Sequence, residues 1–70
     1  MEWIATPESS NLVKFGYEAN SQTLTVEFKN GGLYNYYDVP ASLFEAMKHA
    51  ASKGQFLASQ IKGNYRYARV

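Results

Sequence analysis

The sequence has no cysteine among its 70 residues, which excludes a disulfide framework and a thiolate metal site. A chain of this length forms one domain, and it buries only about 60% of the surface that it exposes when unfolded. Small domains without covalent staples often depend on a partner or on self-association. We therefore expect a single domain over residues 1–70, with residues 1–9 as an N-terminal arm, that assembles into a homo-oligomer.

Long apolar runs are also absent. No stretch approaches the roughly 20 apolar residues that span a bilayer. The start, Met1-Glu2-Trp3-Ile4, has neither the basic residues nor the apolar length of a secretory signal. Together with the lack of cysteine, this predicts a cytoplasmic protein that makes no contact with a membrane.

Groups that commonly carry catalysis are few. The chain has one histidine, His49, and Glu45 one helical turn before it indicates a surface contact between the two side chains. No serine lies in a nucleophile elbow, and no spacing of histidines and acids is typical of a metal site. The sequence therefore predicts a binding protein without enzymatic activity, bound metal or cofactor.

Acidic residues are missing from the C-terminal part of the chain. All six lie in residues 1–45 together with two lysines, which gives that part a net charge of −4. Residues 46–70 contain five cations and no acid, a net charge of +5. These cations are Lys48, Lys53, Lys62, Arg66 and Arg69. Such an asymmetry indicates either an anionic partner or a solvated basic face that only keeps the protein in solution.

Apolar and polar residues alternate in three segments, which predicts three strands. The segments are 12–17, 23–28 and 33–37, joined by turns at 19–22 and at Asn30-Gly31-Gly32. The residues predicted to share the inner face of the first two segments are Val13, Phe15, Tyr17, Leu24, Val26 and Phe28.

Two helices are predicted after these strands. Pro40 suits the first turn of a helix, because its missing N–H is not needed there. Ser52 and Gln55 have the spacing of a capping box, which begins a second helix, and Gly63 or Asn64 ends it. The apolar stripes of the two helices comprise Leu43, Phe44, Met47, Ala50 and Ala51, and then Phe56, Leu57 and Ile61.

The expected architecture is an α+β domain, in which a three-stranded antiparallel β-meander is followed by two helices packed on one face. The tail 65–70 alternates again and is expected to form either a short C-terminal edge strand or an extended arm. At the other end, Trp3-Ile4 is a small apolar arm that Pro7 interrupts.

Several short elements resemble, in their order and spacing, the KTSC domain. They are Gly16-Tyr17, Leu24-x-Val26-x-Phe28, Asn30-Gly31, Tyr34-x-Tyr36-x-x-Val39-Pro40 and Ser52-x-Gly54-x-Phe56, followed by Ile61 and Tyr65. The resemblance covers roughly residues 10–67 and leaves Trp3-Ile4 outside the pattern. That family is named for a C-terminal appendage of some lysyl-tRNA synthetases and also occurs as free-standing proteins of bacteria and phages. The resemblance implies RNA binding, which is the function suggested for this family. A free-standing phage version is also similar to small oligomeric anti-CBASS sponge proteins, which sequester cyclic oligonucleotide immune signals.

Two segments of the basic part combine groups that suit a nucleotide. Ser52-Lys53-Gly54-Gln55 at a helix N-terminus offers backbone N–H groups to an anion, and Lys53 adds a positive charge. The alternative is an ordinary capped turn between two helices. In Tyr65-Arg66-Tyr67-x-Arg69, tyrosines suit stacking on bases while arginines suit phosphates. The alternative is an edge strand whose tyrosines pack inward and whose arginines are solvated.

Three tyrosines of the third predicted strand divide between its two faces. Tyr34 and Tyr36 share a face with core positions of the preceding strand, so core packing is expected for both, and a binding site, which the resemblance suggests for the pair, is the alternative. Tyr37 points to the opposite face and is the better ligand or interface candidate.

The sequence therefore predicts a non-catalytic nucleotide-binding protein. Its candidate ligand-binding residues are Ser52, Lys53, Gly54, Tyr37, Tyr65, Arg66, Tyr67 and Arg69. Lysine and arginine would bind phosphates, and tyrosine would stack on bases. We favour a phage-type sponge that sequesters a cyclic oligonucleotide such as cGAMP in a homo-oligomer. An RNA-binding accessory domain is the alternative. It ranks second because a net charge of +1 disfavours binding to a long nucleic acid. A protein-interaction module without a nucleotide ligand is the third possibility.

Overall fold

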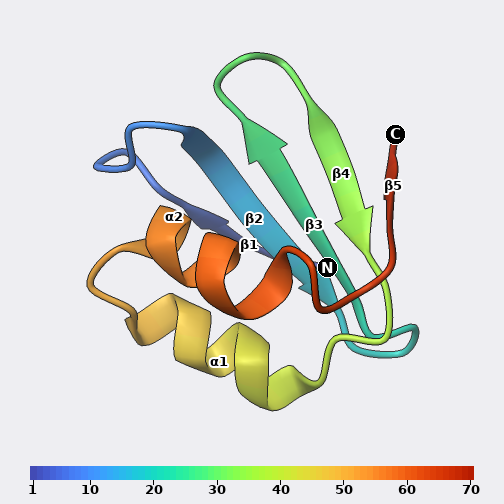
Figure 1. Ribbon diagram of the computed structural model, residues 1–70. Helices are drawn as coiled ribbons and strands as arrows, with labels where there is room; N and C mark the ends of the chain where they lie inside the picture. The colour runs from blue at the N-terminus through green and yellow to red at the C-terminus, as the bar shows by residue number, and fades with distance from the viewer.

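The alternating segments form strands as predicted, but two further strands extend the sheet (Figure 1). In the computed structural model, which describes residues 1–70, the strand order is β1-β2-β3-β4-β5 and all neighbours are antiparallel. The strands are β1 (Glu2–Ala5), β2 (Leu12–Glu18), β3 (Thr23–Phe28), β4 (Leu33–Tyr36) and β5 (Tyr67–Arg69). The predicted turn at Asn30-Gly31-Gly32 joins β3 to β4, with Gly31 at a φ of +95°.

The predicted number of strands, three, was too small, because the two outer strands are short and carry little sequence pattern. The segment expected to be an arm contains β1, which pairs with β2 so that Trp3 lies opposite Gly16. A Cβ atom on Gly16 would lie 2.7 Å from Cε3 of Trp3, so the indole ring rests directly on the glycine backbone. The tail forms β5 on the other edge, which confirms the edge-strand alternative.

One predicted core position of β2 is wrong. Phe15 and Tyr17 are buried as expected, but Val13 is 40% exposed and Leu12 is buried instead. The pairing of β2 with β3 shifts its register between Leu12 and Lys14. Because an extra residue in one strand breaks the two-residue alternation, Val13 turns outward there.

The helices follow β4 in the chain. Helix α1 (Ala41–His49) begins one residue after Pro40, which is its N-cap rather than part of its first turn. Helix α2 (Lys53–Phe56) continues into a π-helical segment (Leu57–Ile61). Gly63, with a φ of +83°, follows the end of that segment, in agreement with the predicted left-handed cap. Glu45 forms an ion pair with Lys48 at 2.9 Å rather than the expected contact with His49.

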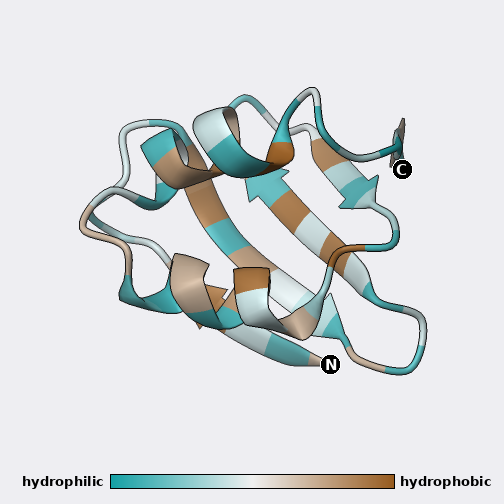
Figure 2. Cartoon of the chain, turned by 60° about the horizontal axis from the view of Figure 1, so that its bottom comes forward, coloured by the Kyte–Doolittle hydropathy of each residue, from teal (hydrophilic) through white to brown (hydrophobic).

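Both helices lie on one face of the sheet and bury its alternate residues (Figures 1 and 2). In Figure 2, apolar positions alternate with polar ones along the strands that the helices cover. The core comprises Leu12, Phe15, Tyr17, Leu24, Val26, Phe28, Tyr36, Val39, Phe44, Met47, Leu57 and Ile61. None of the helices is long and apolar enough to cross a membrane.

Candidate functional site

The helices do not cover the whole sheet face. In Figure 1 they lie in front of the β1–β3 side, whereas β5 stands at the opposite edge with no helix in front of it. A cleft of about 500 Å³ lies between the end of the π-helical segment and the β4–β5 pair. It is lined by Phe28, Asn30, Tyr34, Tyr36, Lys62, Gly63 and Tyr67.

Aromatic rings form one wall of this cleft. The register of β4 and β5 places Tyr36 opposite Tyr67 and Tyr34 opposite Arg69, so these side chains share the helix side of the sheet. The Tyr67 ring centroid lies 5.8 Å from that of Tyr36 and 6.0 Å from that of Tyr34. Phe28 meets Tyr34 edge to face at 5.5 Å. Tyr67 is 62% exposed, so one ring of this cluster is available for stacking.

The hydroxyl groups of Tyr34, Tyr36 and Tyr67 make no hydrogen bond within the protein, which leaves three phenols of the cleft free to bind a ligand. Tyr36 is only 3% exposed, which confirms its predicted core position, while Tyr34 is half-buried. Burial first, and then the neighbouring phenols Tyr34 and Tyr67, raises the pKa of Tyr36. Its hydroxyl therefore stays protonated at neutral pH and can donate a hydrogen bond.

Two cations adjoin the aromatic rings, and neither has an acidic partner. The Lys62 Nζ atom lies 5.0 Å from the Phe28 ring centroid, and the Arg69 guanidinium lies 6.0 Å from that of Tyr34. Neither forms a salt bridge, and no Asp or Glu lines the cleft. The cleft therefore suits a ligand that carries both negative charge and a planar ring.

Two predicted site residues, Tyr37 and Arg66, lie away from this cleft. The backbone N–H of Tyr37 donates to the Arg66 carbonyl at 2.9 Å, which continues the β4–β5 pairing. Since side chains alternate along a strand, Tyr37 and Arg66 face the opposite side from Tyr67 and Arg69. Arg66 pairs with Asp38 at 2.9 Å, and its guanidinium lies 5.6 Å from the Tyr37 ring centroid. Its charge is thus already compensated.

Tyr65, the first residue of the predicted tail motif, is half-buried and packs against the core. Of the predicted aromatic and cationic set, only Tyr67 therefore lines the cleft, and Arg69 lies beside Tyr34, another of its lining residues.

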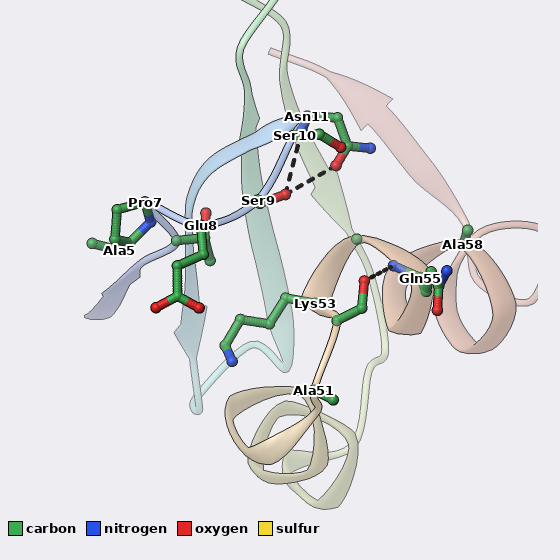
Figure 3. Close-up of a pocket in the computed structure, with 13 residues that line it drawn as sticks. Ala5, Pro7, Glu8, Ser9, Ser10, Asn11, Ala51, Lys53, Gln55 and Ala58 are labelled. Carbon is green, nitrogen blue, oxygen red and sulfur yellow. Dashed lines mark hydrogen bonds between the residues drawn. The ribbon is translucent and has the colours of Figure 1, made fainter.

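Ser52, Lys53 and Gly54 lie in a different place, a pocket of about 670 Å³ between residues 5–11 and residues 51–58 (Figure 3). The Ser52 Oγ accepts a hydrogen bond from the Gln55 backbone N–H at 3.3 Å, but the Gln55 side chain returns none, so one half of the capping box forms. A Cβ atom on Gly54 would lie 2.7 Å from the Asn11 Oδ1. The absence of a side chain there lets the β1–β2 loop pack against α2.

The charges of this second pocket are mixed. The Lys53 Nζ donates to the Ala50 carbonyl at 3.1 Å. Figure 3 shows the Glu8 carboxylate and the Lys53 amine extending toward the same side of the pocket. An anion near Lys53 would meet the negative charge of Glu8, so this pocket suits a nucleotide less well than the cleft does.

Sequence reasoning missed Phe28, Asn30 and Lys62 as members of a site. Lys62 was one of the five C-terminal cations, but only the packing of the π-helical segment places it beside Phe28. Tyr34 and Tyr36 were expected in the core, with a binding role left open, because the pairing of β4 with β5 could not be predicted from their spacing.

Three comparisons relate the chain to known proteins. The sequence model of the KTSC domain matches residues 8–65. The crystal structure of a KTSC domain protein from Yersinia pestis superposes with a TM-score of 0.89 and 28% identity, covering 99% of each chain. An uncharacterized protein from Stutzerimonas stutzeri is 39% identical over 64 residues, which are 90% of each chain.

Larger relatives contain a similar segment. The chain is 41% identical over 64 residues to a lysine–tRNA ligase of Trichormus variabilis and 42% identical to one of Nostoc punctiforme. These matches cover 91% of this chain, but it spans only 11% of the length of each ligase.

Proposed function

This chain belongs to the KTSC domain family, and we propose that it is a non-catalytic domain that binds a short single-stranded segment of RNA. The observation that carries the proposal is the cluster of Tyr34, Tyr36 and Tyr67 beside two cations without acidic partners. Single-stranded nucleic acids are bound by this combination, because bases stack on aromatic rings while cations follow the phosphates.

Each group has a distinct role in this proposal. Tyr67, the exposed ring, stacks on a base, which contributes about 1–3 kcal/mol. Arg69 binds a flanking phosphate through its two-pronged guanidinium, and Lys62 supplies a second positive charge beside the bound strand. With only two free cations at the cleft, the bound segment is short, and duplex binding is not expected.

The relatives support RNA as the ligand class. Two proteins that contain a similar segment are lysine–tRNA ligases, whose name includes an RNA substrate. A binding domain that accompanies such an enzyme needs no catalytic residues of its own.

A second candidate is the sequestration of a cyclic oligonucleotide by a homo-oligomer. The observation that favours it is the position of Tyr67 and Arg69 on β5, an edge strand of the sheet. Two copies that joined along this edge would bring two clefts together around a two-fold symmetric ligand. Sedimentation with and without a cyclic dinucleotide tests this candidate. A monomer near 7.9 kDa under both conditions would exclude it.

The RNA proposal is tested by a matched pair of arginine variants. The fluorescence anisotropy of a labelled single-stranded RNA of about six nucleotides, a length within the range of small stacking sites, is measured with the wild type, Arg69→Ala and Arg66→Ala. We expect Arg69→Ala to weaken binding by roughly tenfold or more, since it removes a charge-assisted hydrogen bond. Arg66→Ala, which lies on the other face and pairs with Asp38, should leave affinity nearly unchanged.

Equal losses in the two variants would mean that the arginines act only through net charge, and the cleft would not be the site. If the wild type binds no RNA and no nucleotide, a protein-interaction module becomes the better description of the domain.

A further inference from the structure

Asn30 lies at the rim of the cleft, in the turn between β3 and β4. Its Oδ1 atom accepts a hydrogen bond from the Gly32 backbone N–H at 2.9 Å. Because only the oxygen of an amide accepts from an N–H, this contact fixes the orientation of the Asn30 side chain. The Nδ2 group, with its two donors, makes no hydrogen bond to the protein.

Other polar groups around the cleft add to this excess of donors. Lys62 and Arg69 carry only donors, and the neutral phenol of Tyr36 also has a proton to give. No carboxylate lines the cleft to act as a strong acceptor. The phenol oxygens can accept as well as donate, but both charged groups, Lys62 and Arg69, are donors only, so a ligand edge with adjacent acceptors finds stronger partners here than an edge that alternates donor and acceptor.

The two purines differ in just this respect. On the edge that carries N7, guanine presents two acceptors, N7 and O6, whereas adenine presents the N7 acceptor beside the N6 amino donor. An asparagine usually reads adenine with its oxygen and nitrogen together. The Asn30 oxygen is already held by Gly32, so this two-point contact to adenine is weakened while the two donors remain available.

We propose that Asn30, together with Lys62, selects guanine over adenine in the bound single strand by donating hydrogen bonds to N7 and O6. This inference rests on the proposed RNA-binding function and names the base that the cleft prefers. Tyr67 stacks on the base without discriminating among bases, and Asn30 supplies the discrimination at its edge.

The test compares short uridine oligonucleotides that carry a single central guanosine, adenosine or 7-deazaguanosine. All three carry the same charge, so their affinity ratios do not report general electrostatics. Wild-type protein is expected to bind the guanosine strand roughly 5- to 150-fold more tightly than the adenosine strand, the range of one good two-point contact. The 7-deazaguanosine strand lacks the N7 acceptor and should lose much of that preference.

Asn30→Ser is the matched variant, because a serine hydroxyl can still accept from the Gly32 N–H and retain the turn. It removes the amide donors and should bring the guanosine and adenosine affinities to within about twofold of each other, since the two-point contact is gone. Asn20→Ser, the same change in the β2–β3 turn away from the cleft, should keep the wild-type ratio. Melting curves establish that both variants are folded.

Each result separates the base selectivity from the underlying function. Tight but equal binding of all three strands by wild-type protein would overturn the role of Asn30 and leave RNA binding intact. A guanosine preference that survives Asn30→Ser, or that ignores the loss of N7, would also overturn it. No binding of any strand would overturn both proposals.

Discussion

Two regions of one sheet face use tyrosine in opposite ways. On the side covered by the helices, Tyr17 stacks on Phe44 with ring centroids 5.0 Å apart, and its hydroxyl donates to the Val39 carbonyl at 2.6 Å. On the β4–β5 side, Tyr36 and Tyr67 lie 5.8 Å apart, and neither hydroxyl has a partner in the protein. We refer to these as the covered region and the open region.

The extent of the helices, and not the residue type, decides whether a tyrosine hydroxyl on this face has a partner within the protein. In the covered region α1 supplies both the second ring and, through the segment before it, the acceptor for the hydroxyl. In the open region no helix lies over β5, so Tyr34 and Tyr67 line a cleft, and of the three tyrosines there only Tyr36 also belongs to the core. The covered region holds the fold, and we propose that the open region binds the ligand.

The largest expected effect is on stability in the covered region. Phe44→Ala removes a buried ring that packs on both Phe15 and Tyr17, and it should lower the free energy of unfolding by about 3–5 kcal/mol. In so small a domain much of this variant would be unfolded at room temperature. Urea titration measures the effect, and a loss below about 1 kcal/mol would show that the covered region does not hold the fold.

In the open region, an equivalent truncation should act on affinity. Tyr67→Ala removes the exposed ring and is expected to weaken RNA binding by about 1–3 kcal/mol, with little change in melting temperature. Anisotropy and thermal melting on the same samples separate the two effects. A large drop in melting temperature at unchanged affinity would instead make Tyr67 part of the core.

The hydroxyl groups offer a matched pair with smaller effects. Tyr17→Phe leaves the Val39 carbonyl without its hydrogen bond and should cost about 1–2 kcal/mol of stability. Tyr36→Phe removes a hydroxyl that has no protein partner, so stability should be nearly unchanged. Urea titration measures the free energy of unfolding of both variants. An equal loss in the two would contradict the contrast between the covered and the open region.

The smallest expected effect is shared by both regions. Burial raises the pKa of Tyr17 and of Tyr36 above the ordinary value of 10.0. The folded protein thus holds these two protons more tightly than the unfolded chain does. The protonated hydroxyls therefore contribute to the free energy of unfolding below about pH 10, and this contribution is lost as the pH rises through the raised pKa values. In alkaline buffers, the melting temperature should fall more steeply with rising pH for the wild type than for a variant with phenylalanine at both positions. Parallel curves would contradict this.

Local sequence patterns predicted the central part of the fold and failed where a feature depended on distant pairing. The alternation of Leu24, Val26 and Phe28 specifies β3, because a strand buried on one face needs that period. β1 was not predicted, because a pattern of four residues is too short to identify a strand. In addition, the residue on which the Trp3 ring packs is Gly16, which lies on another strand.

The candidate site shows the same division. Tyr67 and Arg69 were identified from the alternation of aromatic and cationic residues in the tail. Their neighbours Arg66 and Tyr37 were grouped with them, although the strand directs those two to the other face. Asn30 could not be assigned to the site, because only the folded chain brings the β3–β4 turn to the same cleft as Lys62 and Tyr67.

The most direct test of RNA binding at the open region is a map of backbone amide chemical shifts during titration with a short single-stranded RNA. We predict that the largest shifts fall in residues 28–36 and 62–69, which surround the cleft of the open region, and that residues 51–55 show almost none. Shifts confined to residues 5–11 and 51–58 would place the ligand in the pocket beside α2 and would contradict the assignment of binding to the open region.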